Sequence, residues 1–190
     1  MIISESKLRK AIREEILELF TIPTHNKHSG FDLYTEEDSD IEAKEAKMKK
    51  PGAGFLVARV FPEDEVKFLG LVAPEKIRNK KGGTYDIPKG KLKKKESDFD
   101  GAVRECEEES GISISQDDLV GKPVKYKNLT IFLASCEQDP KIKPNPETGI
   151  IEHEGFNWLS RDEIVDSCLN YLKPAVKSLA DRFIDSLDKN

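Results

Sequence analysis

The sequence has few cysteines, no long apolar run and no excess of positive charge. Its three cysteines, Cys106, Cys136 and Cys168, are widely spaced, and this odd set gives neither a disulfide framework nor a zinc-binding spacing. No stretch approaches the roughly 20 apolar residues that span a bilayer, and the N-terminus has no apolar run of signal-peptide length. A formal net charge of −5 argues against a protein that coats a nucleic-acid backbone. These absences predict a cytoplasmic protein with reduced thiols and no membrane partner.

By pattern, the 190 residues divide into an N-terminal part, residues 1–50, and a main domain, residues 51–190. In the first part, apolar residues at three- and four-residue spacing predict an amphipathic helix: Leu8, Ile12, Ile16 and Leu19. We expect this helix either to dock on the main domain or to bind a partner or a second copy of the chain. A polar connection follows it.

From Gly52 onward, short apolar segments alternate with turn and helix signals. Residues 54–61 and 66–73 flank the sequence Pro-Glu-Asp-Glu and predict a hairpin. Further strands are predicted within residues 84–88, 124–136 and 150–160, and helices over residues 97–110, after a capping box of Ser160 and Glu163, and from Pro174 to about Leu187. Strands that alternate with helices in one domain predict an α/β sandwich.

The segment Arg-Glu-Cys-Glu-Glu-Glu-Ser-Gly-Ile, residues 104–112, concentrates negative charge on the predicted helix. At about 100° per residue, Glu105, Glu108 and Glu109 fall on one face, while Glu107 points elsewhere. Like charges three and four positions apart on a helix repel each other. A divalent cation between the three carboxylates would relieve that repulsion, and hard oxygen ligands favour magnesium or manganese over zinc.

This acidic segment completes a longer pattern, GKLKKKESDFDGAVRECEEESGI, which closely resembles the Nudix box. The seven fixed positions of that box are occupied by Gly90, Glu96, Arg104, Glu105, Glu108, Glu109 and Gly111. Cys106 replaces the usual Leu, Ile or Val, and cysteine packs as a small hydrophobic residue. The resemblance implies a Nudix α/β/α sandwich with a mixed sheet, here preceded by an N-terminal helical extension that matches nothing in the family.

Sequences on both sides of the box resemble Nudix enzymes that act on diadenosine polyphosphates or on the 5′ end of RNA. Tyr-Asp-Ile-Pro-Lys-Gly-Lys-Leu is similar to the segment that leads into the box in that group, with Tyr85 in place of Trp and Lys91 in place of His. Glu-His-Glu-Gly-Phe-Asn-Trp-Leu is similar to a later strand. That similarity assigns an additional acid position to Glu152, with Glu154 as its rival.

The resemblance also implies roles for the box residues. Glu105, Glu108 and Glu109 would be metal ligands and catalytic acids, and Glu152 a further ligand or a general base. Arg104 would orient a box glutamate, Glu96 would bind an additional metal ion or brace the loop, and Gly90 would let the backbone turn tightly at the metal site. The implied cofactor is Mg²⁺ or Mn²⁺.

Basic and aromatic residues near the box are candidates for substrate contacts. Lys89 and Lys91 flank Gly90 and are candidates for phosphate binding, whereas Lys93–Lys95 are equally well explained as solvated lysines. Tyr126 and Phe132 are candidates for stacking on a base, although a core position is the simpler expectation for Phe132.

Together these features predict a pyrophosphohydrolase for a nucleoside polyphosphate, such as diadenosine tetraphosphate or a 5′-triphosphorylated RNA end. ADP-ribose, a nucleoside triphosphate or a diphosphoinositol phosphate are alternative substrates. A nucleotide-sensing module without activity is a different class, which typically lacks box acids that this chain retains. The sequence leaves the oligomeric state open.

Overall fold

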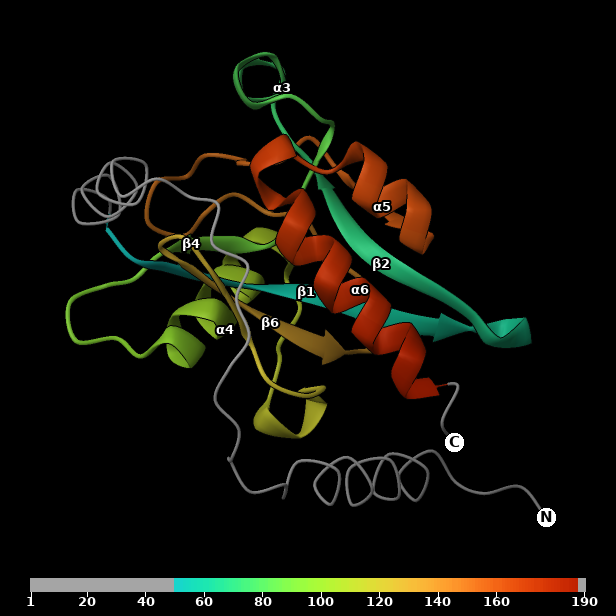
Figure 1. Ribbon diagram of the computed structural model, residues 1–190. Helices are drawn as coiled ribbons and strands as arrows, with labels where there is room; N and C mark the ends of the chain where they lie inside the picture. Colours follow the sequence, from blue (N-terminus) through green and yellow to red (C-terminus); the bar gives the residue numbers. More distant parts are fainter. Residues whose placement is uncertain (1–49, 188–190) are drawn as a thin grey trace, which may run out of the picture. The chain divides into compact units, whose positions relative to one another are not determined.

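The computed structural model describes residues 50–187, so the predicted N-terminal helix lies outside the described residues and stays a prediction (Figure 1). The strands are β1 Gly52–Phe61, β2 Glu65–Val72, β3 Tyr85–Asp86, β4 Lys89–Lys91, β5 Val124–Tyr126, β6 Leu129–Ser135 and β7 Phe156–Leu159. The helices are α3 Glu75–Lys81, α4 Asp98–Ser110, α5 Arg161–Ser167 and α6 Lys173–Leu187, with 3₁₀ turns at Pro62–Asp64, Gln116–Asp118 and Asn170–Leu172.

All seven of these strands belong to one mixed sheet, as predicted. Its main order is β3-β2-β1-β6-β5, with β4 paired to the beginning of β1 and β7 paired to β2. The β1 and β6 strands run parallel, while the other pairs are antiparallel. The predicted hairpin is formed by β1 and β2.

The central strand β1 separates two apolar layers. Side chains alternate along a strand, so Phe55 and Val57 pack toward α4, while Leu56 and Ala58 pack toward α6. Figure 1 shows α6 running across the sheet at β1 and β6. The result is the α/β/α sandwich expected from the sequence. None of the helices in the described part of the chain has the length and apolar character needed to cross a membrane.

The box helix α4 begins and ends at the residues predicted from the sequence. The Ser97 side chain accepts a hydrogen bond from the backbone N–H of Asp100 at 3.1 Å, which caps the first turn. Gly111 has φ 68° and ψ 13°, the left-handed conformation that ends a helix most easily with glycine. The capping box of Ser160 and Glu163 at the start of α5 is also confirmed.

Three details differ from the predictions. The predicted strand over residues 124–136 is two antiparallel strands, because the chain turns at Lys127, which has φ 55°. The strand predicted within residues 150–160 is confined to β7, Phe156–Leu159, and Glu152 therefore lies in the preceding loop. Helix α3 was not predicted, because its sequence is mostly charged and it buries none of its residues, so it has no apolar periodicity.

Candidate active site

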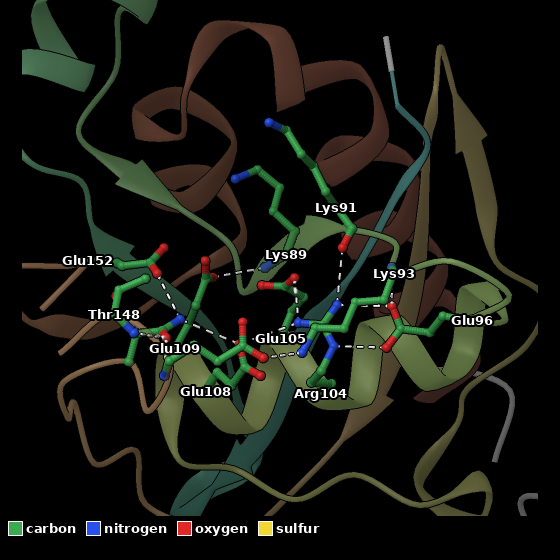
Figure 2. Close-up of polar contacts among 12 residues, drawn as sticks. Lys89, Lys91, Lys93, Glu96, Arg104, Glu105, Glu108, Glu109, Thr148 and Glu152 are labelled. Atoms are coloured by element: carbon green, nitrogen blue, oxygen red, sulfur yellow. Dashed lines mark hydrogen bonds and ion pairs between the residues drawn. The ribbon is translucent and has the colours of Figure 1, made fainter. Parts of the chain in front are cut away.

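One arginine on α4 holds three carboxylates together (Figure 2). Arg104 donates from Nε to Glu96 Oε1 at 2.8 Å and from Nη2 to Glu96 Oε2 at 3.0 Å, a bidentate pair. Its Nη1 donates to Glu105 Oε1 at 2.7 Å and lies 3.3 Å from Glu108 Oε2. The Arg104 side chain is 19% exposed and each of the three glutamates is 13% exposed, so water screens these contacts weakly. This is the placement expected of a residue that orients box glutamates.

Glu96 braces the loop that leads into α4. Besides Arg104, its carboxylate accepts the backbone N–H of Lys93 at 2.7 Å. The hydrogen bonds from Arg104, with that from Lys93, lower the pKa of Glu96 to about 2, against the opposing effect of burial. Glu96 is therefore a fixed negative charge at any physiological pH.

Gly90 makes room for the Glu105 carboxylate. The residue lies within β4, opposite Ala53 of β1. A Cβ atom at this position would lie 2.1–2.2 Å from the three carboxylate atoms of Glu105, well inside any tolerable contact. The expectation of a tight turn at Gly90 is wrong, because its backbone is strand-like and outside the left-handed region. The box requires glycine here for close approach of the acid.

Glu109 points into the interior between β4 and α4. It is 8% exposed, and its Oε2 accepts the backbone N–H of Lys89 at 2.9 Å. The Lys89 ammonium instead pairs with Asp86 at 2.7 Å, and the side chain is only 14% exposed. Burial lowers the pKa of Lys89, but the charge and hydrogen bond of Asp86, together with the charge of Glu109, outweigh it and raise that pKa, so the ammonium stays charged.

Two acids of α4, Glu105 and Glu109, are crowded enough to resist ionisation. Burial raises the pKa of Glu105, as do the neighbouring charges of Glu108 and Glu152, while Arg104 opposes the shift. Burial raises the pKa of Glu109 well above its usual range, with Asp86 and Glu105 adding to the effect and Lys89 opposing it. These carboxylates thus lack sufficient positive charge from the protein, which is the condition in which a bound cation is most stabilising.

Glu152 and Glu154, the two candidates for the additional acid position, lie in different surroundings. Asn145 Nδ2 donates to Glu152 Oε1 at 2.9 Å and lies 3.5 Å from Glu108 Oε2, so Glu152 faces the acids of α4. Glu154 instead pairs with Arg78 at 3.2 Å and accepts the backbone N–H of Glu75, the first residue of α3. Sequence reasoning missed Asn145, since an asparagine in a Pro- and Lys-rich loop is normally a turn residue.

His153 lies beside these acids with an unused ring nitrogen. The side chain is 6% exposed, and it lines a small recess with Glu108, Glu109, Asn145 and Glu152. Within residues 50–187, no group hydrogen-bonds to its Nδ1. Burial is the main cause that lowers the pKa of His153 to about 4, so the ring is neutral at physiological pH.

Of the four residues predicted to contact substrate, only some are exposed. Lys91 is exposed, whereas the pairing of Lys89 with Asp86 argues against a direct phosphate contact by Lys89. Figure 2 shows both lysine side chains directed away from the acids of α4. Phe132 is 9% exposed and packs 5.6 Å from the Phe55 ring centroid, so it is a core residue and not an open stacking surface. Tyr126 packs against the apolar layer on the α6 side of the sheet.

Residues 50–183, which include every residue of this site, match the NUDIX domain family. The chain belongs to the Nudix family. It is 30% identical over 132 residues to a MutT-like protein of Streptomyces ambofaciens, covering 67% of this chain and 79% of that relative. It is 32% identical over 114 residues to an uncharacterized 17.7 kDa protein from the e–segB intergenic region of Enterobacteria phage T4, covering 60% of this chain and 68% of the relative.

Among solved structures, a C. elegans Ap4A hydrolase binary complex has the same fold. Its TM-score is 0.53 at 20% identity, over 73% of this chain and 99% of that chain. The family match and this fold make the chain a Nudix hydrolase.

Nudix hydrolases generally use divalent metal ions, and the donor set here fits that chemistry. Glu105, Glu108, Glu109 and Glu152 supply only hard oxygen ligands, and two of them have raised pKa values. In the described part of the chain, no three acidic, histidine or cysteine groups already stand in metal-ligand geometry. Arg104 contacts Glu105 through Oε1 and Glu108 through Oε2, so each carboxylate has a second oxygen that could serve as a ligand.

Proposed function

We propose that this Nudix hydrolase is a metal-dependent pyrophosphohydrolase that cleaves a phosphoanhydride bond of a nucleoside polyphosphate. The substrate class is a dinucleoside polyphosphate such as diadenosine tetraphosphate, or a 5′-triphosphorylated RNA end. The observation that carries the proposal is the cluster of Glu105, Glu108 and Glu109, crowded beyond what the neighbouring cations of the protein neutralise. Mg²⁺ or Mn²⁺ bound there would neutralise phosphate oxygens and lower the pKa of a bound water.

Each residue of the cluster has a distinct task in this proposal. Glu105, Glu108 and Glu109 hold the ions on the α4 face, with Glu152 contributing from the opposite loop. Arg104 keeps Glu105 and Glu108 directed toward the same space and is itself fixed by its bidentate pair with Glu96. The backbone N–H of Lys89 hydrogen-bonds to Glu109 and so holds that carboxylate in place. The Lys89 side chain has no phosphate contact in this proposal.

The substrate class is supported by charge and by resemblance. Lys91 is exposed on β4, next to the Gly90 position where Glu105 approaches the strand. An exposed cation beside a metal site favours a substrate with several phosphates. The segment from Tyr85 to Leu92 resembles that of enzymes for diadenosine polyphosphates and RNA 5′ ends. The proposal places the enzyme in the cytoplasm, where its three buried thiols would remain reduced.

A substrate panel tests this function. Diadenosine tetraphosphate, ADP-ribose, nucleoside triphosphates and 5′-triphosphorylated RNA would be incubated with Mg²⁺ or Mn²⁺ and scored by product. We expect turnover of the first or the last, and a fall of at least about 100-fold in kcat/KM for Glu108→Gln, because a ligand should matter at least as much as its outer-shell partners.

Glu107→Gln is the matched control. Glu107 is an exposed neighbour on the same helix, and its substitution removes the same charge as Glu108→Gln. Equal losses in both variants would show a general effect of charge and would contradict the assigned site. Hydrolysis of ADP-ribose or a nucleoside triphosphate alone would refute the substrate class while leaving the site in place.

A further inference from the structure

The loop between β6 and β7 carries a second connection across the acidic site. Asn145 lies in this loop, and its Nδ2 is 2.9 Å from Glu152 Oε1 and 3.5 Å from Glu108 Oε2. It therefore contacts one acid from the loop and one from α4. Among the described residues, Arg104 and Asn145 are the side chains for which such direct contacts to Glu108 are observed.

The orientation of the Asn145 amide is fixed by its own loop. Its Oδ1 accepts the backbone N–H groups of Glu147 at 2.9 Å and Thr148 at 3.2 Å. The oxygen therefore faces the turn, and the NH₂ group must face the carboxylates. The Asn145 backbone is also engaged, with its N–H donating to Ile150 O at 2.8 Å and its carbonyl accepting from Gly149 N at 2.7 Å.

The loop itself is attached on two sides of the acidic face. Near its beginning, the backbone N–H of Lys141 donates to Ser110 O, at the end of α4, at 2.7 Å. At its tip, Glu147 forms an ion pair with Lys93, which precedes α4. These two attachments hold the Asn145 amide beside α4.

We propose that Asn145 is a positioning residue that directs Glu152 toward Glu108, so that the loop acid joins the acids of α4 in one cation site. This inference rests on the proposed function, because it takes Glu152 to be a working ligand. One hydrogen bond to Oε1 limits the rotation of the Glu152 carboxylate and keeps this oxygen on the side of the α4 acids. Without that bond, Glu152 would turn to solvent, because it is an exposed loop residue close to other negative charges.

Asn145→Ala and Thr148→Val separate positioning from a role in the turn. Asn145→Ala removes the NH₂ donor together with the oxygen that accepts from Glu147 and Thr148, whereas Thr148→Val alters the same turn and keeps the NH₂ group. We expect about a tenfold fall in kcat/KM and about tenfold weaker Mn²⁺ binding, followed by electron paramagnetic resonance, in Asn145→Ala. Thr148→Val is the matched control, since it perturbs the same turn without touching an acid, and it should behave as wild type.

Equal impairment of Thr148→Val and Asn145→Ala would show that Asn145 serves only the turn, and would overturn the proposal. A double-mutant cycle adds a second test. In the Glu152→Gln background, Asn145→Ala should change kcat/KM by less than about twofold, because its effect passes through Glu152. A further tenfold fall in that background would mean that Asn145 acts elsewhere.

The Mn²⁺ titration needs no substrate, so it decides the Asn145 proposal even if none of the nucleotides is hydrolysed and the proposed function fails. Unchanged Mn²⁺ affinity in Asn145→Ala, beside clearly weakened affinity in Glu152→Gln, would overturn the positioning role alone.

Discussion

Gly90→Ala is the smallest change that displaces a box acid. The added Cβ would lie 2.1–2.2 Å from the Glu105 carboxylate atoms, about 1.2 Å short of the 3.4 Å at which ordinary contact begins. Because the backbone of Gly90 is not in the left-handed region, alanine introduces no backbone strain. The clash therefore falls on the end of a flexible side chain, and Glu105 must move by about 1 Å away from β4.

A movement of this size breaks the 2.7 Å contact between Glu105 and Arg104 and misplaces one ligand of the site. A misplacement of about 1 Å can lower a rate by about 10²-fold, whereas the fold should lose little stability. We therefore expect kcat/KM for diadenosine tetraphosphate with Mn²⁺ to fall about 100-fold, with Tm within about 3 °C of wild type.

Gly155→Ala is the matched control, because none of the described residues has an atom within 4 Å of a Cβ at that position. It should keep the wild-type kcat/KM and Tm. A Gly90→Ala enzyme with kcat/KM within about threefold of wild type would refute the argument that Glu105 works from its place against β4.

Three further predictions follow from the charges of the site. Glu109→Gln should abolish turnover but raise Tm by about 3 °C at pH 8. The glutamine amide oxygen can still accept the backbone N–H of Lys89, while the buried negative charge is removed, so a lower Tm would contradict this prediction. Without metal, stability should fall as pH rises through the raised pKa values of Glu105 and Glu109, because the native state binds more protons than the unfolded chain. One fixed concentration of Mg²⁺ should therefore raise Tm more at pH 8 than at pH 5. At 100 times its Kd at pH 8, the ion should add about 2.7 kcal/mol to the free energy of unfolding, and equal gains at both pH values would count against this prediction. Arg104→Lys should lower kcat/KM by at least about tenfold, because lysine cannot form the bidentate pair with Glu96 and also contact Glu105; wild-type kcat/KM would contradict that role.

The sequence was most informative where local rules decide the structure. Ser97 and Gly111 mark the ends of α4 because capping depends on neighbouring residues, and the three acids share a face because helical periodicity is fixed. The alternation of β1 between two apolar layers likewise follows from strand geometry.

The remaining features depend on contacts between distant residues, which no local pattern specifies. Lys89 was expected to bind phosphate, but its ammonium pairs with Asp86 and its backbone N–H hydrogen-bonds to Glu109. The sequence left Phe132 as a core residue or a stacking candidate, and its packing against Phe55 and Phe99 confirms the core position. Asn145 was not predicted, because its contact with Glu152 depends on how the loop folds back on α4.

The central claim is that the crowded carboxylates of α4 hold divalent cations. An anomalous difference map from crystals grown with Mn²⁺ tests it most directly. The account predicts a peak within ligand distance, about 2.2 Å, of oxygens from at least two of Glu105, Glu108 and Glu109. A fully occupied Mn²⁺ elsewhere on the domain, with Arg104 still closing the space between these acids, would contradict it.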